Sequence, residues 1–155
     1  GPLRRNAGAG PHAGAAAGDG LIRLLMHTQV SLVGAPTDIG ASTRGASMGP
    51  EALRVAGLQQ TLEAQGVEVV DRGNLGGPGN PCLPPVDGYR HLAEVAAWNR
   101  LVHDAVHGEL ASGRLPILLG GDHSLAIGSI AAVGRHCRQT AALAGGTFTR
   151  WPSTS

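Results

Sequence analysis

Apolar residues form three short runs along the chain, each rich in Val, Ile or Leu, at positions 30–36, 67–70 and 115–119. Runs of this length, bounded by Gly, Pro or polar residues, favour buried strands. Between and after them, apolar residues recur every three or four positions, which predicts helices over residues 49–66, 89–111 and 125–135. The order βαβαβα predicts an α/β fold with three α-β-α layers, in which helices cover both faces of a parallel sheet.

Two loops separate the predicted elements, and the second has a length that is typical of functional or mobile loops. Residues 37–48 follow the first strand as a Gly-rich loop, and residues 74–88 form a second loop rich in Pro and Gly. The Gly-Gly-Pro-Gly stretch at 76–79 matches neither a GxGxxG nor a Walker phosphate-binding pattern. Because ligands of open parallel sheets bind beyond the carboxyl ends of the strands, we expect functional residues at that edge.

The composition limits which partners and compartments fit this chain. Twelve basic and eleven acidic residues leave a formal net charge of +1, too small a field to favour nucleic acid or an acidic membrane surface. No apolar run approaches the roughly 20 residues that a membrane helix needs. Cys82 and Cys137 lie far apart and outside any CxxC pattern, which indicates a reducing, cytoplasmic location.

Residues 1–25 are dominated by Gly, Ala and Pro, and we predict a disordered low-complexity extension there. The alternative is a secretory signal, because Arg4 and Arg5 precede a run of small residues. Such signals need an apolar core, and Arg23 interrupts the leucine-rich stretch that would have to supply it. Export is therefore disfavoured.

The segment after the third predicted strand combines a flexible backbone with groups that bind metals. Gly120 and Gly121 permit a tight turn, Asp122 and His123 follow, and Ser124 is placed to cap the next helix. His123 therefore occupies a position suited to a metal ligand or a catalytic base. The alternative is structural, with Asp122 as a helix cap and His123 satisfying backbone groups. The chemistry of these residues alone favours neither interpretation.

A family resemblance changes that balance. Residues 120–129, Gly-Gly-Asp-His-Ser-Leu-Ala-Ile-Gly-Ser, resemble the first metal-binding signature of the ureohydrolase (arginase–agmatinase) family. Upstream, Gly-Ala-Pro at 34–36 and the stretch at 44–58, which contains Gly-Pro-x-x-Leu-Arg, are similar to the arginase branch. The resemblance spans about residues 30–138. It implies the N-terminal part of an arginase-like α/β domain at residues 26–138, followed by an aberrant tail at 139–155.

The resemblance also implies a metal site and a reaction. The family histidine at the position of His123 ligates one of two Mn²⁺ ions, and Gly120, Gly121, Asp122 and Ser124 support it. A hydroxide that bridges the ions attacks the guanidinium carbon of L-arginine and yields L-ornithine and urea, because coordination makes hydroxide available at neutral pH. Agmatine or another guanidino compound is the alternative substrate. The complete family fold further implies a homo-oligomer, a trimer or hexamer.

Most of the implied metal ligands are missing from this sequence. The family takes its carboxylates from an Asp-Ala-His-x-Asp stretch and a later Asp-x-Asp stretch, and neither pattern occurs here. One imidazole cannot hold two Mn²⁺ ions, which need several carboxylates. We therefore expect no catalytic residue within this chain, no hydrolysis by the chain alone, and poor stability from an open sheet edge. A non-enzymatic role, as a pseudoenzyme or an oligomerisation partner, is the alternative.

His103 and His107 carry a separate hypothesis. They lie one helical turn apart with Asp104 beside the first, which resembles part of the HExxH zinc motif. A zinc hydrolase would need a third ligand and a glutamate in place of Asp104. A solvated polar face of an amphipathic helix is the favoured interpretation. Trp98 is expected to pack in the same helix, and Trp151 in the tail is assigned no function.

Overall fold

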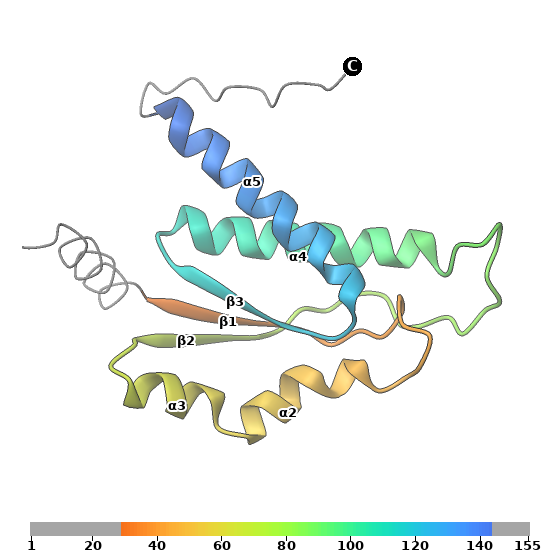
Figure 1. Cartoon of the computed structure of the whole chain (residues 1–155), viewed down its shortest axis with the longest axis horizontal. Helices are drawn as coiled ribbons and strands as arrows, with labels where there is room; N and C mark the ends of the chain where they lie inside the picture. Colours follow the sequence, from red (N-terminus) through yellow and green to blue (C-terminus); the bar gives the residue numbers. More distant parts are fainter. Residues whose placement is uncertain (1–28, 144–155) are drawn as a thin grey trace, which may run out of the picture.

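The computed structural model describes residues 29–143, which form a parallel sheet with helices on both sides (Figure 1). Its strand order is β2-β1-β3, and the strands are β1 (Val30–Ala35), β2 (Val69–Asn74) and β3 (Leu115–Gly120). Both outer strands run parallel to β1. The predicted α/β class and parallel sheet are confirmed.

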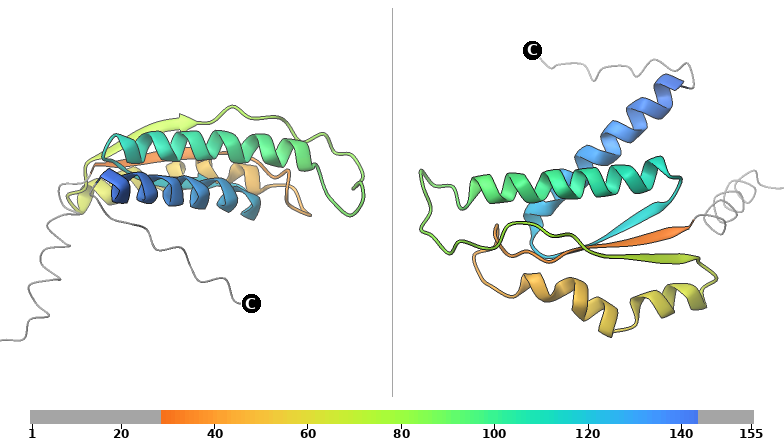
Figure 2. Two further views of the ribbon diagram at one scale, coloured as in Figure 1. Left: turned by 90° about the horizontal axis from the view of Figure 1, so that it is seen from above. Right: turned by 180° about the vertical axis from the view of Figure 1, so that it is seen from behind.

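The helices lie on opposite sides of the sheet because successive crossovers run in opposite directions. From β1 the chain crosses to β2, and from β2 it returns past β1 to β3, so right-handed connections place their helices on different faces. Figures 1 and 2 show one pair on each side: α2 (Gly49–Val55) with α3 (Leu58–Ala64), and α4 (Leu92–Ala111) with α5 (Ala126–Leu143). Single 3-10 turns precede α2 and α5, namely η1 (Ala46–Met48) and η2 (His123–Leu125).

Two apolar clusters hold the layers together, one on each face of β1, which is buried along its whole length. The buried members on the α4 side are Ala35, Ile39, Trp98, Val102, Val106, Leu125 and Ala132. Those on the α3 side are Val30, Leu32 and Leu119, with Leu58 and Leu62 packed against them. Full burial of one large apolar side chain contributes about 1.5–3 kcal/mol, so these clusters dominate the stability of the fold.

The single helix predicted over residues 49–66 is wrong, because the structure divides it into α2 and α3. Gly57 lies between them with φ of 80°, a left-handed conformation that glycine adopts without strain and that ends a helix. After this break Leu58 packs against the sheet, whereas Val55 at the end of α2 remains 88% exposed. The apolar periodicity was the same on both sides of the break and did not reveal it.

Other boundaries also differ from those predicted. Strand β2 extends to Asn74, beyond the expected run at 67–70, and α4 begins at Leu92 rather than at residue 89. Helix α5 continues to Leu143, past the expected end at residue 135 and past the expected domain limit at 138. Residues 139–143 are therefore helical, while the division of the chain into a domain and a tail stays a prediction.

Several sequence expectations concern the ends of the chain and its surroundings. The extension predicted at residues 1–25 and Trp151 lie outside the described residues. Within residues 29–143, no helix combines the length and the apolar character required to cross a membrane. Cys82 and Cys137 are free and exposed.

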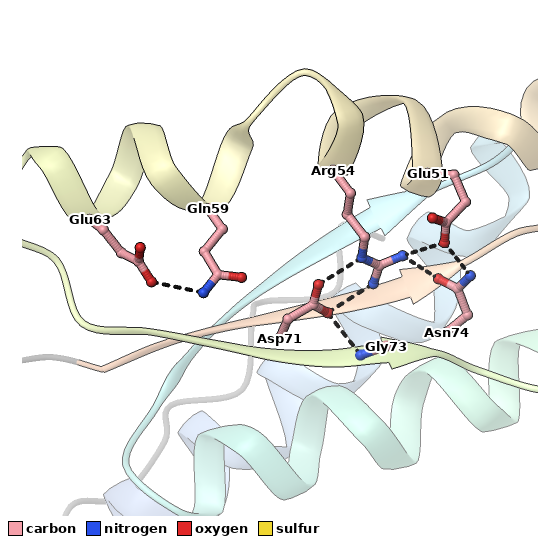
Figure 3. A network of polar contacts seen from close by, with 7 residues as sticks. All are labelled: Glu51, Arg54, Gln59, Glu63, Asp71, Gly73 and Asn74. Atoms are coloured by element: carbon pink, nitrogen blue, oxygen red, sulfur yellow. Dashed lines mark hydrogen bonds and ion pairs between the residues drawn. The ribbon is translucent and has the colours of Figure 1, made fainter.

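A charged network joins α2 to β2 (Figure 3). Arg54 of α2 forms a two-point ion pair with Asp71 of β2, at 2.7 Å from Nε to Oδ2 and 2.9 Å from Nη2 to Oδ1. The same guanidinium donates through Nη1 to Glu51 and Asn74. These charge-assisted hydrogen bonds from Arg54 hold the pKa of Asp71 below its ordinary value. The network therefore fixes α2 against the edge of the sheet.

Replacing Arg54 by alanine is expected to lower the free energy of unfolding at neutral pH by about 1–3 kcal/mol, because Asp71 loses its charged partner. The folded-state pKa of Asp71 lies below the unfolded value of about 3.9, so the pair stabilises fully above that pH. This contribution is lost as the pH falls through the folded-state pKa. Urea unfolding should show a difference between the two proteins that shrinks only below about pH 4.

The exposed Arg100 of α4 supplies the matched control, and Arg100→Ala should change the free energy of unfolding by less than about 0.5 kcal/mol. The difference in free energy of unfolding between the Arg54→Ala variant and the unmodified chain should not stay constant into strong acid. A constant difference would contradict the assigned role of Asp71.

Candidate active-site turn

Asp122 builds the turn that follows β3. Its Oδ1 atom accepts a hydrogen bond from the backbone N–H of Ser124 at 2.8 Å, which caps η2. Its Oδ2 atom accepts from the backbone N–H of Gly40, also at 2.8 Å, in the loop that follows β1. Both carboxylate oxygens thus bind backbone groups, and Asp122 holds two loops together at the carboxyl edge of the sheet.

Gly121 allows these two loops to come into direct contact. Ala35 and Gly120 are partners in the parallel register of β1 and β3, so the chain leaves both strands side by side. Next to Gly121, the N–H of Asp122 donates to the carbonyl oxygen of Thr37 at 3.1 Å. A Cβ atom on residue 121 would lie 1.8 Å from that oxygen. Close packing of backbone therefore requires this glycine.

His123 is the first residue of η2, and its side chain is exposed. The imidazole hydrogen bonds found within residues 29–143 belong to His103 and His107 rather than to His123. The structural interpretation of the turn is thus correct for Asp122 but has no support for His123. An exposed imidazole at the carboxyl edge of a parallel sheet is available to bind a ligand.

The described residues do not by themselves form a metal site. Within residues 29–143, no three His, Cys, Asp or Glu side chains are grouped so that they could hold a metal ion. Asp122, the carboxylate next to His123, uses both oxygens to accept backbone hydrogen bonds. His123 fits a metal as one imidazole ligand, but the carboxylates that Mn²⁺ requires are not brought to it by this part of the chain.

Asp38 also shapes this edge of the sheet, although the sequence pattern did not single it out. It is 7% exposed and accepts hydrogen bonds from the backbone N–H of Gly45 at 3.1 Å and the side chain of Asn80 at 3.1 Å. The Asn80 hydrogen bond, followed by that of Gly45, holds the pKa of Asp38 below its ordinary value. Asp38 therefore connects the loop after β1 to the loop after β2. An acidic residue just beyond the first predicted strand was the available signal.

The histidine pair of α4 has structural partners. Nδ1 of His103 lies 2.8 Å from Asp104, and Nε2 of His107 lies 2.8 Å from the Gln139 side chain of α5. The two rings stack with centroids 5.9 Å apart. His136 lies edge-on to His107, yet no metal-holding group of three forms in the part of the chain that the structure describes. The zinc hypothesis therefore gains no third ligand.

Trp98 has a packing role, as expected. Its side chain is 3% exposed and lies in the α4-side cluster. Its indole N–H donates to the carbonyl oxygen of Pro78 at 2.9 Å. Trp98 thus fastens the loop at residues 75–91 to α4.

Fold and turn together define an α/β protein of the open parallel-sheet class, with an exposed histidine at the carboxyl edge of the sheet. The family model described as "Arginase family" matches residues 28–144. The chain belongs to the arginase family, which confirms the resemblance recognised in its sequence.

Individual relatives agree with this assignment. An arginase of Brevibacillus brevis is 38% identical over 113 residues, covering 73% of this chain and 38% of that protein. The solved arginase of Bacillus caldovelox matches with a TM-score of 0.65 at 37% identity, covering 70% of this chain and 37% of that one. The arginase of Entamoeba histolytica, solved in complex with L-ornithine, matches with a TM-score of 0.62 at 30% identity, covering 70% and 36%. The chain thus spans little more than a third of the length of these relatives.

Proposed function

We propose that His123 is one imidazole ligand of a manganese centre that hydrolyses L-arginine to L-ornithine and urea. The observation that carries this proposal is the exposed imidazole of His123 on a turn that Asp122 and Gly121 fasten to the neighbouring loop. Family membership supports it, as does the bound L-ornithine of the Entamoeba histolytica relative. When bound, manganese supplies a hydroxide nucleophile at neutral pH.

The residues of this chain would position that ligand rather than carry out the reaction. Asp122 keeps the turn in place through its two backbone hydrogen bonds, and Ser124 closes the first turn of η2. Residues 29–143 do not bring further metal ligands together with His123. We therefore propose that the chain alone does not turn over substrate, and that activity requires further polypeptide in a homo-oligomer or another assembly. A cytoplasmic location stays a prediction.

The proposal is tested by manganese titration of the purified chain, followed by the loss of the free-ion signal in electron paramagnetic resonance. Because residues 29–143 bring no further ligands to His123, the unmodified chain should bind Mn²⁺ only weakly, and His123→Ala should weaken that binding at least tenfold, about 1.4 kcal/mol. His136→Ala, which removes a half-buried imidazole from α5, is the matched control and should leave the binding unchanged. If the His123→Ala variant bound Mn²⁺ as tightly as the unmodified chain, the assignment of His123 as a metal ligand would be wrong.

Urea release from L-arginine, measured in the same samples with Mn²⁺ added, is expected to be absent in both the unmodified chain and the His123→Ala variant. Activity that disappears in the variant would show that assembly supplies the missing ligands, and would overturn the proposed inactivity of the isolated chain. Release from agmatine would identify the alternative substrate.

A non-enzymatic role as an oligomerisation partner is the second candidate, and one surface favours it. A groove of about 530 Å³ lies between α4, β3 and α5, and its lining includes Leu110, Leu118, Ile130 and Val133. Ile130 is 70% exposed, and Ile127 on the same helix is 67% exposed. Exposed apolar surface of this kind is typical of a protein interface. A folded chain that self-associates yet binds no Mn²⁺ would favour this role.

A further inference from the structure

Two adjoining hollows lie on the loop between β2 and α4, which projects from the carboxyl edge of the sheet (Figure 1). The smaller hollow has a volume of about 220 Å³ and lies between this loop and the loop after β1. The larger hollow has a volume of about 400 Å³ and lies between the same loop and the first turn of α4. Leu83 and His91 line both, so the two hollows share a wall.

The smaller hollow is cationic. The guanidinium groups of Arg44 and Arg90 line it together with the imidazole of His91, and none of the described residues in its lining is acidic. The arginine ion pairs found within residues 29–143 are formed by other residues, namely Arg54, Arg72 and Arg114. Guanidinium forks without carboxylate partners are suited to an oxyanion.

The carboxylate of Asp38 does not neutralise this charge, because its oxygens are engaged elsewhere. They accept hydrogen bonds from the backbone N–H of Gly45 and from the side chains of Ser47 and Asn80. The hydrogen bonds of Asn80 and Gly45, and after them the charge of Arg44, hold the pKa of Asp38 below its ordinary value. Arg44 nevertheless takes no part in the ion pairs found within residues 29–143, so its N–H groups are available to a ligand.

The larger hollow is mainly apolar, although it is open to solvent. Its large apolar side chains are 62% to 71% exposed, namely Leu83, Val86, Tyr89 and Leu92. Exposed apolar side chains gathered around a hollow are typical of a binding site. Asp87 and Glu94 also line this hollow, which disfavours an anionic group there. The ring of Tyr89 offers a flat face on which an aromatic base can stack.

Hydrogen bonds fix the shape of this loop. The backbone groups of Val86 and Tyr89 exchange two N–H to carbonyl hydrogen bonds, of 2.9 and 2.8 Å. Between them Asp87 and Gly88 have φ angles of 51° and 80°, and positive values at both central positions are typical of a type I′ turn. Asn80 in the smaller hollow is held through both its amide nitrogen and its amide oxygen. A ligand would therefore meet a largely formed site.

We propose that the two hollows together bind a nucleoside monophosphate, with the phosphate in the smaller hollow and the base in the larger one. A phosphomonoester carries a charge of about −1.5 to −2 at neutral pH, which matches two guanidinium groups. The base would cover the exposed apolar side chains and stack on Tyr89. Free phosphate would satisfy the arginines alone, and a free nucleoside would fill the apolar hollow alone. The inference does not depend on the proposed function, because His123 lines neither hollow.

Isothermal titration calorimetry of the full chain with adenosine monophosphate, adenosine and inorganic phosphate tests the proposal. Adenosine monophosphate should bind at least about tenfold more tightly than either of the others, because only it fills both hollows. Arg44→Gln and Arg90→Gln should each weaken its binding by about fivefold or more and leave adenosine binding unchanged. Tyr89→Ala should weaken the binding of adenosine monophosphate and of adenosine by about the same factor, while phosphate binding stays unchanged.

Arg100→Gln on α4 and Ile130→Ala on α5 replace exposed residues far from the loop in sequence, and these matched controls should leave all three affinities unchanged. Because Arg44, Arg90 and Tyr89 are exposed, their variants should unfold in urea like the unmodified chain. The proposal is overturned if adenosine monophosphate binds no more tightly than adenosine or than phosphate, or if none of the three binds. It is also overturned if the Arg44→Gln/Arg90→Gln double variant still prefers adenosine monophosphate to adenosine.

Discussion

Replacing Gly121 by alanine is expected to destabilise the fold by about 2–4 kcal/mol, from overpacking and from one lost hydrogen bond. The new methyl group would lie 1.8 Å from the carbonyl oxygen of Thr37. That oxygen belongs to backbone, so the two loops must separate, and the Asp122–Thr37 hydrogen bond of 3.1 Å must break with them. Urea unfolding monitored by circular dichroism measures the loss.

Gly120→Ala provides a control that differs by one position. A Cβ atom at residue 120 would meet only Leu125 Cδ1, at 3.8 Å, which is an ordinary van der Waals contact. We expect its effect to stay below about 1 kcal/mol, within the range of substitutions that disturb no specific feature. If the two variants lost equal free energy of unfolding, the close approach of Thr37 would not explain why glycine occupies position 121.

Trp98→Ala is expected to cost about 3–5 kcal/mol, the usual range for deleting a buried aromatic side chain. The indole is 3% exposed in the α4-side cluster, and its N–H is bonded to Pro78. Since the whole stability of a small domain is about 5–15 kcal/mol, the variant should melt at least 10 °C lower, at about 4–8 °C per kcal/mol, or lose its cooperative transition. A thermal melt followed by circular dichroism checks this.

Trp98→Phe separates packing from hydrogen bonding, because it keeps most of the apolar bulk and removes the donor to Pro78. It should lose less than half as much stability as Trp98→Ala, while limited proteolysis within residues 75–91 should become faster in both variants. Unchanged proteolysis would mean that the indole N–H does not hold this loop against α4.

The residues of the signature turn divide into two kinds. Gly121 and Asp122 hold the turn through close packing and backbone hydrogen bonds, whereas the exposed His123 remains free to bind a ligand. The sequence motif placed all of them together without distinguishing these roles. Substitutions at Gly121 or Asp122 that reduce metal binding would therefore act through the position of His123.

The sequence predicted the strands and the parallel α/β class because short apolar runs and helical spacing are local patterns. They can be recognised without knowing which segments pack together. It placed β1 and β3 nearly at their observed limits and identified the turn at 120–124. It did not reveal the break at Gly57, since glycine in a helical pattern either remains helical or adopts a left-handed conformation according to what its neighbours pack against. The later end of β2 likewise depends on pairing with β1.

The sequence alone determined the order of elements, and it drew attention to the turn after the third strand, which holds the histidine that we propose as a metal ligand. Only the tertiary structure decided which distant residues meet there. The parallel register brings the ends of β1 and β3 together, so Thr37 and Gly40 contact Gly121 and Asp122 although they lie far apart in the chain. The contact between Asp38 and Asn80 follows from the same cause, because loops that leave neighbouring parallel strands must share one edge, and no local pattern records which side chains they bring together.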